Sequence, residues 1–383
     1  MRRQGAWGRI ASVLSSLKLT LACLALLMIL VVVCTLAQVP LGTYLAVERI
    51  IRSLFVWWTP ANGWPRLPVF PGGGLVGIVL LVNLVFAQFL RLEWSRRKAG
   101  LWLTHVGLAL LFVGEFSTAL LQVDGQMPLQ IGQTRDYSED ARQMELAATD
   151  ATDPAEDLVV SIPQSFLKAG AEIAHPALPF RLAVRRYYEN SALAARRPGD
   201  PPSEADGGIG PNLIVHPSPA VASDDGQNAA AALVEPFDGR NAFGRFWVSN
   251  ALGAPQGFVR EGRVWRLSLR PRRYYLPFSI TLKEFRHDQY LGTDIPKNFS
   301  SLVRLNDPGR GEDRDVLIHM NSPLRHGGQT FYQASFGKDD RLSVLQVVRN
   351  PGWLIPYLSC ALIAAGLLLH FGQKLASSLR APR

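Results

Sequence analysis

Two titratable side chains, His105 and Glu115, lie in the stretch 100–121, which is otherwise apolar and long enough to cross a bilayer. A titratable group within such a span is costly, so it normally faces a partner, a cavity or a cofactor. Neutral imidazole is among the commonest axial ligands of haem iron. Beside His105, Trp102 and Gly107 offer an apolar surface and room for a close helix or a flat ring. The residues alone leave two interpretations of His105, a haem-iron ligand and a hydrogen-bonding residue between helices.

His370 and Glu115 are further candidates within the apolar stretches. His370 lies at a depth similar to that of His105, which permits a bis-histidine site within this chain; the alternative is an interfacial position. Glu115 follows His105 by ten residues, about 80° around a helix, and is therefore not its direct partner. We expect Glu115 to form a hydrogen bond with Asn83 or Gln88, or to be protonated.

His319 and His326 flank the segment Asn321-Ser322-Pro323-Leu324. Their spacing is loose for a metal site, so we expect both on a loop surface. The sequence contains no evident nucleophile with a neighbouring general acid or base, and it therefore does not indicate an enzyme.

Four apolar stretches predict membrane-spanning helices, because a hydrocarbon core of about 30 Å needs about 20 apolar residues per helix. They are about 19–37, 75–92, 100–121 and 353–371. Between the first two, residues of about 44–58 alternate apolar and charged positions at roughly helical spacing and end in Trp57 and Trp58. This pattern predicts an interfacial helix with its tryptophans in the aromatic belt. The alternative is a tryptophan-rich surface for a flat cofactor.

The net charge of +9 is a signal of membrane topology and does not indicate nucleic-acid binding. Residues 122–350 carry 26 Lys/Arg against 28 Asp/Glu, so the basic excess lies in the short flanks of the apolar stretches, such as Arg96-Arg97-Lys98. By the positive-inside rule these flanks are cytoplasmic. The predicted protein is a multi-pass membrane protein, with both termini cytoplasmic and residues 122–350 on the outside.

The N-terminal basic and apolar segment could be a cleaved signal peptide, but its apolar run is too long for a typical one, and we expect a retained anchor. The three cysteines, Cys23, Cys34 and Cys360, all lie in the apolar stretches. The predicted external domain therefore has no disulfide and no Cys-x-x-Cys redox pair.

Residues 122–350 predict a β-rich domain, because short alternating segments such as 278–285 and 342–348 are separated by turn signals. Within it, residues 240–286 carry ten Lys/Arg against two Asp/Glu. This basic run is either a solvated strand face or a contact for an anion, such as lipid headgroups, haem propionates or an acidic partner.

Five short motifs accompany this architecture. Ser16–Thr20 (SLKLT) begins the first span and Leu103–Gly107 (LTHVG) lies in the third. Pro296–Ser301 (PKNFSS) precedes Asn321–Leu324 (NSPL) and Gly328–Ser335 (GQTFYQAS). With three spans, a large domain and one further span, the chain resembles the ResB family, the Ccs-type B proteins of System II cytochrome c biogenesis.

The resemblance implies an assembly role for a multi-pass protein of the bacterial inner membrane, with both termini cytoplasmic and residues 122–350 periplasmic. ResB-like proteins pair with a CcsA/ResC-type protein, carry haem across the membrane and present it to apocytochrome c, whose thiols a thioredoxin-like partner keeps reduced. His105 matches the family's intramembrane histidine, so it is expected to ligate haem b iron jointly with a histidine of the partner. The ligation chemistry is expected in that partner.

The alternative from another functional class is a membrane-anchored periplasmic ligand-binding or sensor protein. It would make His105 a packing residue and would need a cytoplasmic output module, for which the cytoplasmic segments are too short. A transporter is a weaker interpretation, because the four spans show no evident repeat or broken helix.

Overall fold

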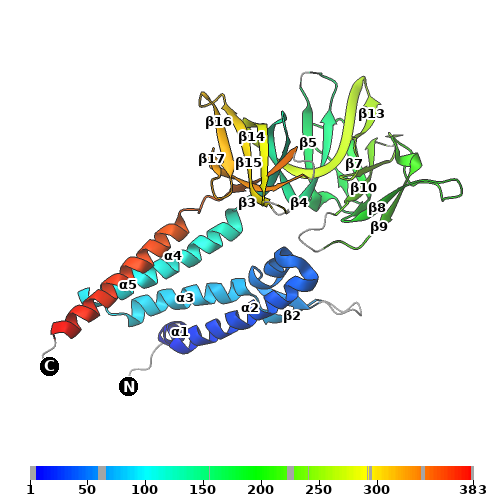
Figure 1. Ribbon diagram of the computed structural model, residues 1–383. Helices are drawn as coiled ribbons and strands as arrows, with labels where there is room; N and C mark the ends of the chain where they lie inside the picture. The colour runs from blue at the N-terminus through cyan, green and yellow to red at the C-terminus, as the bar shows by residue number, and fades with distance from the viewer. Residues whose placement is uncertain are drawn as a thin grey trace. The chain divides into compact units, whose positions relative to one another are not determined.

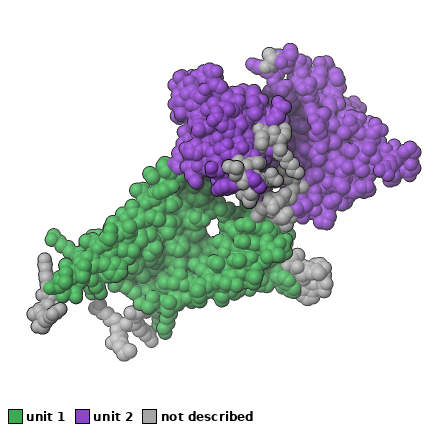
Figure 2. Space-filling model, in the orientation of Figure 1, with its two compact units in different colours: residues 1–123, 222–225, 350–383 green, residues 124–221, 226–349 purple. Residues whose placement is uncertain are grey.

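The computed structural model describes residues 6–58, 66–154, 156–221, 228–239, 241–290, 292, 296–337 and 341–380. The chain divides into two compact units (Figure 2). The membrane unit, green in Figure 2, comprises the chain up to Val123 and from Asn350 onward. The β unit, purple in Figure 2, comprises Asp124–Val221 and Gly226–Arg349.

The membrane unit is helical (Figure 1). Its α-helices are α1 (Ala6–Leu14), α2 (Leu17–Ala46), α3 (Gly73–Arg91), α4 (Ala99–Leu121) and α5 (Ile355–Arg380). Among the described residues, four helical segments are long and apolar enough to cross a membrane, namely Leu17–Ile51, Gly73–Arg91, Arg96–Leu121 and Ile355–Leu379. The four spans expected from the sequence are therefore present as helices in the structure.

The connection between the first two spans differs from the helix expected over about 44–58. Gly42 breaks α2 with a φ of 73°, a left-handed conformation that glycine adopts without a Cβ clash. The chain then continues helically to Ile51, while Phe55–Trp58 forms strand β1, paired with β2 (Leu67–Pro71). The run Phe-Val-Trp-Trp consists of aromatic and β-branched residues, which favour an extended strand over a helix. Trp57 and Trp58 are both more than half exposed on this hairpin.

Helices α4 and α5 pack closely through small residues. Gly100, Gly107 and Gly114, spaced by seven, are the buried residues of α4. A Cβ on Gly107 would lie 2.7 Å from a side-chain carbon of Ile363, and one on Gly100 would lie 2.6 Å from the carbonyl oxygen of Gly366. The missing side chains therefore let the two backbones approach, as in other membrane helix pairs.

The β unit contains a ten-stranded antiparallel sheet in the described residues. Its path is β16 (Glu312–His319), β15 (Pro296–Asp307), β14 (Arg263–Gln289), β4 (Thr134–Asp150), β3 (Val123–Gln130), β19 (Leu342–Arg349), β18 (Gln329–Phe336) and β17 (Leu324–His326), with β13 (Gln256–Arg260) on β14 and β5 (Leu158–Pro163) on β4. A five-stranded sheet has the path β11 (Asn241–Ala242), β10 (Ala231–Asp238), β7 (Arg181–Tyr188) and β6 (Glu172–Ile173), with β12 (Phe246–Ser249) on β10. Strands β8 (Ser191–Ala195) and β9 (Leu213–Pro217) form a separate pair. The predicted β-rich domain is confirmed.

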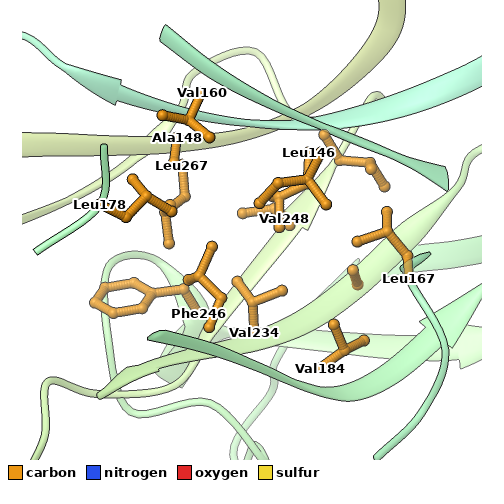
Figure 3. Packing of buried hydrophobic residues seen from close by; sticks show 14 of the residues in the cluster. Leu146, Ala148, Val160, Leu167, Leu178, Val184, Val234, Phe246, Val248 and Leu267 are labelled. Carbon is orange, nitrogen blue, oxygen red and sulfur yellow. The ribbon is translucent and has the colours of Figure 1, made fainter. Parts of the chain in front are cut away.

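The first core of the β unit lies between the two sheets (Figure 3). Leu146 and Leu267 of β4 and β14 pack with Val184, Val234 and Val248 of the five-stranded sheet. This is the face-to-face packing of a β-sandwich, in which every second residue of a strand points inward.

The second core lies within the ten-stranded sheet itself, where the later half of β14 packs with β3, β15, β18 and β19. At its edge, the hydroxyl group of Ser301 bonds with the side chains of Gln333 (2.6 Å) and Ser343 (2.7 Å). Ser301 and Ser343 are fully buried. Two motif residues, Ser301 and Gln333, thus form a hydrogen-bonded link between β15, β18 and β19.

The arginines of the basic run in β14 face acidic residues of β4, the neighbouring strand. Arg270 Nε lies 2.9 Å from Glu145 Oε1, and Arg273 Nε lies 3.3 Å from Glu139 Oε1. Glu145 also accepts a hydrogen bond from the Ser161 hydroxyl group. These basic residues, which are in excess along the sequence, are therefore paired with acidic residues of the neighbouring strand. This arrangement favours the interpretation of the basic run as a solvated strand face.

The buried pair of Glu145 and Arg270 predicts a strong mutational effect. Glu145 is 2% exposed, so Glu145→Ala leaves Arg270 without its partner in a largely buried position. We expect a loss of about 3 kcal/mol in the free energy of unfolding, measured by chemical unfolding of the purified full chain with circular dichroism of the strands.

The matched control is Glu204→Ala. Glu204 pairs with Arg186 at 3.3 Å, and both side chains are about half exposed. Exposed pairs contribute at most about 1 kcal/mol. Equal losses in the two variants would contradict a structural role of the buried pair.

Candidate functional site

A cavity of about 410 Å³ in the membrane unit brings together the polar residues of the helices. Its polar lining consists of Ser15, Thr20, Asn83, Arg91 and His105. Leucines of α2, α3 and α4, Ala87 and Phe112 complete the lining. The volume lies within the range of about 300 to 1,000 Å³ that is usual for small-molecule sites. The SLKLT and LTHVG motifs therefore meet at one cavity.

His105 presents one ring nitrogen as a possible ligand. Its Nδ1 lies 2.8 Å from the carbonyl oxygen of Leu101, one turn earlier in α4. Because a carbonyl oxygen only accepts, Nδ1 carries the proton in this contact, and the lone pair of the neutral ring is on Nε2. A backbone carbonyl on the other ring nitrogen is the usual arrangement of a metal-binding histidine. The donor set therefore fits an iron ligated through Nε2.

Asn83 fixes the beginning of α2 against α3. It is 1% exposed. Its Oδ1 accepts from the hydroxyl group of Thr20 at 2.6 Å, and its Nδ2 donates to the carbonyl oxygens of Leu14 (2.6 Å) and Ser16 (3.1 Å). Ser16 itself caps α2, because its side chain accepts from the backbone N–H of Lys18. The SLKLT motif thus serves to position one wall of the cavity.

His370 is not among the residues that line this cavity. It lies on α5, where its Cβ would be 2.8 Å from a Cβ placed on Gly100. His105 lies about 160° around α4 from Gly107, which faces α5. The two histidines are therefore on different sides of α4, and the structure does not bring them together as a bis-histidine site.

Glu115 does not form the hydrogen bonds expected with Asn83 or Gln88. The side chain of Asn83 bonds with the start of α2, and Gln88 Nε2 donates to the carbonyl oxygen of Trp102 at 3.3 Å. Glu115 is exposed on α4, and no ion pair of it is found among the described residues. Of the two expectations for Glu115, the hydrogen bond is wrong, because Asn83 has nearer polar partners in the SLKLT segment.

His319 is exposed, as expected, although it is the last residue of β16 and not part of a loop, and the expectation for His326 is wrong. His326 is 7% exposed, and its Nε2 lies 2.7 Å from Asp307 Oδ2. Phe278 packs edge-on against its ring at 4.7 Å between centroids. In the structure, the chain around Asn321 forms a tight turn that returns His326 to the sheet as part of β17. The hydrogen bond to His326 lowers the pKa of Asp307 below its usual value.

In the parts of the chain that the structure describes, no three His, Cys, Asp or Glu side chains gather as a metal-binding cluster. Cys23 and Cys34 are buried in the membrane unit and Cys360 is exposed there.

The pair of Asp307 and His326 predicts a pH dependence. A lowered pKa in the folded state stabilises the protein above the unfolded value of about 3.9, and this stabilisation is lost as the pH falls through the folded value. We expect Asp307→Asn to melt at a lower temperature than the wild type at neutral pH. The difference should begin to shrink below about pH 4, near the unfolded value, and should disappear as the pH falls through the lower folded value, where the wild-type carboxylate becomes protonated. Melting curves across pH test this, and a constant difference would contradict it.

Comparison with known proteins supports the family indicated by the motifs. Residues 254–344 match the model of the ResB-like family. Protein NrfI of Wolinella succinogenes is 36% identical over 102 residues, which are 27% of this chain and 11% of that protein. The chain thus matches about a tenth of the length of this curated relative. The resemblance to the ResB family is confirmed, and residues 254–344 are a ResB-like family region.

Proposed function

We propose that this chain is a haem-handling membrane subunit of cytochrome c biogenesis. In this proposal it works with a CcsA/ResC-type membrane protein and presents haem to apocytochrome c. The ResB-like match and the similarity to NrfI support a biogenesis role in general. The observation that carries the haem proposal is the imidazole of His105 in the cavity, with Nδ1 bound to Leu101 and Nε2 available as a ligand.

The cavity suits a large apolar ring held from one side. Leu80, Leu108 and Phe112 offer apolar contacts beside His105. Leu17 and Leu24, which also line it, are 66% and 46% exposed, so part of the lining is open to another chain. We infer that this chain supplies one axial ligand and one wall, and that the partner supplies the second ligand.

The proposed topology follows from charge. Arg96, Arg97 and Lys98 precede α4, and Lys374 lies toward the end of α5. If these basic ends are cytoplasmic, the β unit attaches at the opposite ends of α4 and α5 and is periplasmic. There it would contact the partner or the apocytochrome, whose thiols a thioredoxin-like protein reduces. The attachment chemistry is assigned to the partner, so this chain is proposed to be a delivery subunit and not itself an enzyme.

The haem proposal predicts a spectroscopic change. Replacing His105 with alanine removes the axial nitrogen, so His105→Ala, purified with its partner, should lose the b-type haem spectrum and most cytochrome c maturation. The measurements are the reduced-minus-oxidised spectrum of the complex and the amount of holocytochrome c.

The matched control is His370→Ala, which removes an imidazole outside the cavity and should retain the haem spectrum. Unchanged haem content and maturation in His105→Ala would contradict the proposal. That result would favour a membrane-anchored ligand-binding or sensor protein, in which His105 is a packing residue.

A further inference from the structure

The cavity is polar at one end and apolar at the other. Along α3, its lining runs from Arg91 through Asn83 to Leu80. These positions span about 16 Å at the rise of an α-helix. Ser15 lies at the Arg91 end, and Leu80 and Phe112 lie at the apolar end. Such a lining fits an amphipathic ligand that carries its charge on one side.

Arg91 is an exposed residue at the end of α3, and it has no ion pair within the described chain. Its Nε donates to the hydroxyl group of Ser15 at 3.1 Å. Ser15 is 4% exposed and donates in turn to the carbonyl oxygen of Ser12 at 3.4 Å. The nearby carboxylate of Glu93 pairs with Lys98 at 2.6 Å. Of the five N–H donors of the guanidinium group, those on the two Nη atoms remain for an acceptor in the cavity.

A guanidinium group binds a carboxylate through two parallel hydrogen bonds, and its geometry is specific for this kind of planar anion. Arg91 lies at the end of a span and lines the same apolar cavity as His105, so it is placed to bind an acidic ligand there. Haem b has this form, because its iron lies in an apolar macrocycle that carries two propionate carboxylates on one edge.

We propose that Arg91, positioned by Ser15, binds a propionate carboxylate of the haem whose iron His105 ligates. This inference rests on the proposed haem function. It orients the haem with its carboxylate edge toward the basic end of α3 and its apolar edges toward Leu80 and Phe112. The ligand is then selected by two separate contacts, one to the iron and one to the carboxylates.

The test compares haem with its dimethyl ester, in which both carboxylates are neutral. Both are titrated into the purified full chain in phospholipid-free detergent and followed by the Soret band. In the wild type, we expect the ester to bind roughly 10- to 100-fold more weakly than haem, the factor typical of a hydrogen bond to a charged group. In Arg91→Gln, haem and its ester should bind equally, at the affinity of the ester in the wild type.

Arg97→Gln is the matched control. Arg97 is exposed like Arg91 and lies six residues further along the chain, but it does not line the cavity, so this variant should keep the wild-type preference for haem. Ser15→Ala keeps the charge of Arg91 but removes its support, and should reduce the preference only in part. Comparable circular dichroism and gel-filtration profiles identify the variants that are folded.

The outcomes separate the two proposals. If the wild type does not bind haem, or if His105→Ala binds it unchanged, the proposed function fails. If haem binds through His105 but esterification weakens binding equally in the wild type and in Arg91→Gln, only the assignment of Arg91 fails, and the proposed haem function stands. If anionic phospholipid added in nanodiscs abolishes the preference for haem in the wild type, Arg91 binds a lipid phosphate, and the assignment to propionate is overturned.

Discussion

Inside a membrane, a buried amide must find its hydrogen-bonding partners within the protein, and Asn83 finds three of them at the beginning of α2. Its contacts with Thr20, Leu14 and Ser16 join the segment between α1 and α2 to the middle of α3. Without them, polar groups would be left unsatisfied in an apolar environment, at a cost that water does not reduce. These contacts join two of the walls of the cavity that His105 lines.

The two other polar groups of the cavity depend on the same arrangement. Arg91 reaches Ser15, which directly precedes the Ser16 cap of α2, and His105 uses a carbonyl group of its own helix. The glycine face of α4 is meanwhile occupied by α5. α4 thus uses one face for close helix packing and another for the cavity. This division explains why His105 and His370, although similar in depth, do not form one site.

The β unit shows a different use of the family motifs. The match to the ResB-like family covers residues 254–344, which lie outside the cavity, and its motif residues Ser301 and Gln333 form a buried link between strands. The family match therefore rests on residues that form the β-sheet framework and not on residues that line the cavity. The proposed haem site rests on the geometry of the membrane unit and on the sequence resemblance at His105.

Much of the fold could be predicted from the sequence, because hydropathy and charge act locally along the chain. Four apolar stretches, their basic flanks and a β-rich domain follow from periodicity and composition, and His105 stands out as a titratable group within a span. The strand at Phe55–Trp58 was missed because a short aromatic run is compatible with either an interfacial helix or a hairpin until its partner, Leu67–Pro71, is known.

Contacts between distant residues were decided by the tertiary structure. The arginines of β14 form an excess in the sequence, yet Glu139 and Glu145 face them from a strand more than a hundred residues earlier. His326 is similarly buried by Asp307 and Phe278, and Arg91 joins the cavity through Ser15. The sequence by itself determined which segments are apolar and where the unusual polar residue lies. Only folding decided which polar groups meet, because hydrogen bonds and ion pairs depend on distances in space that local composition does not record.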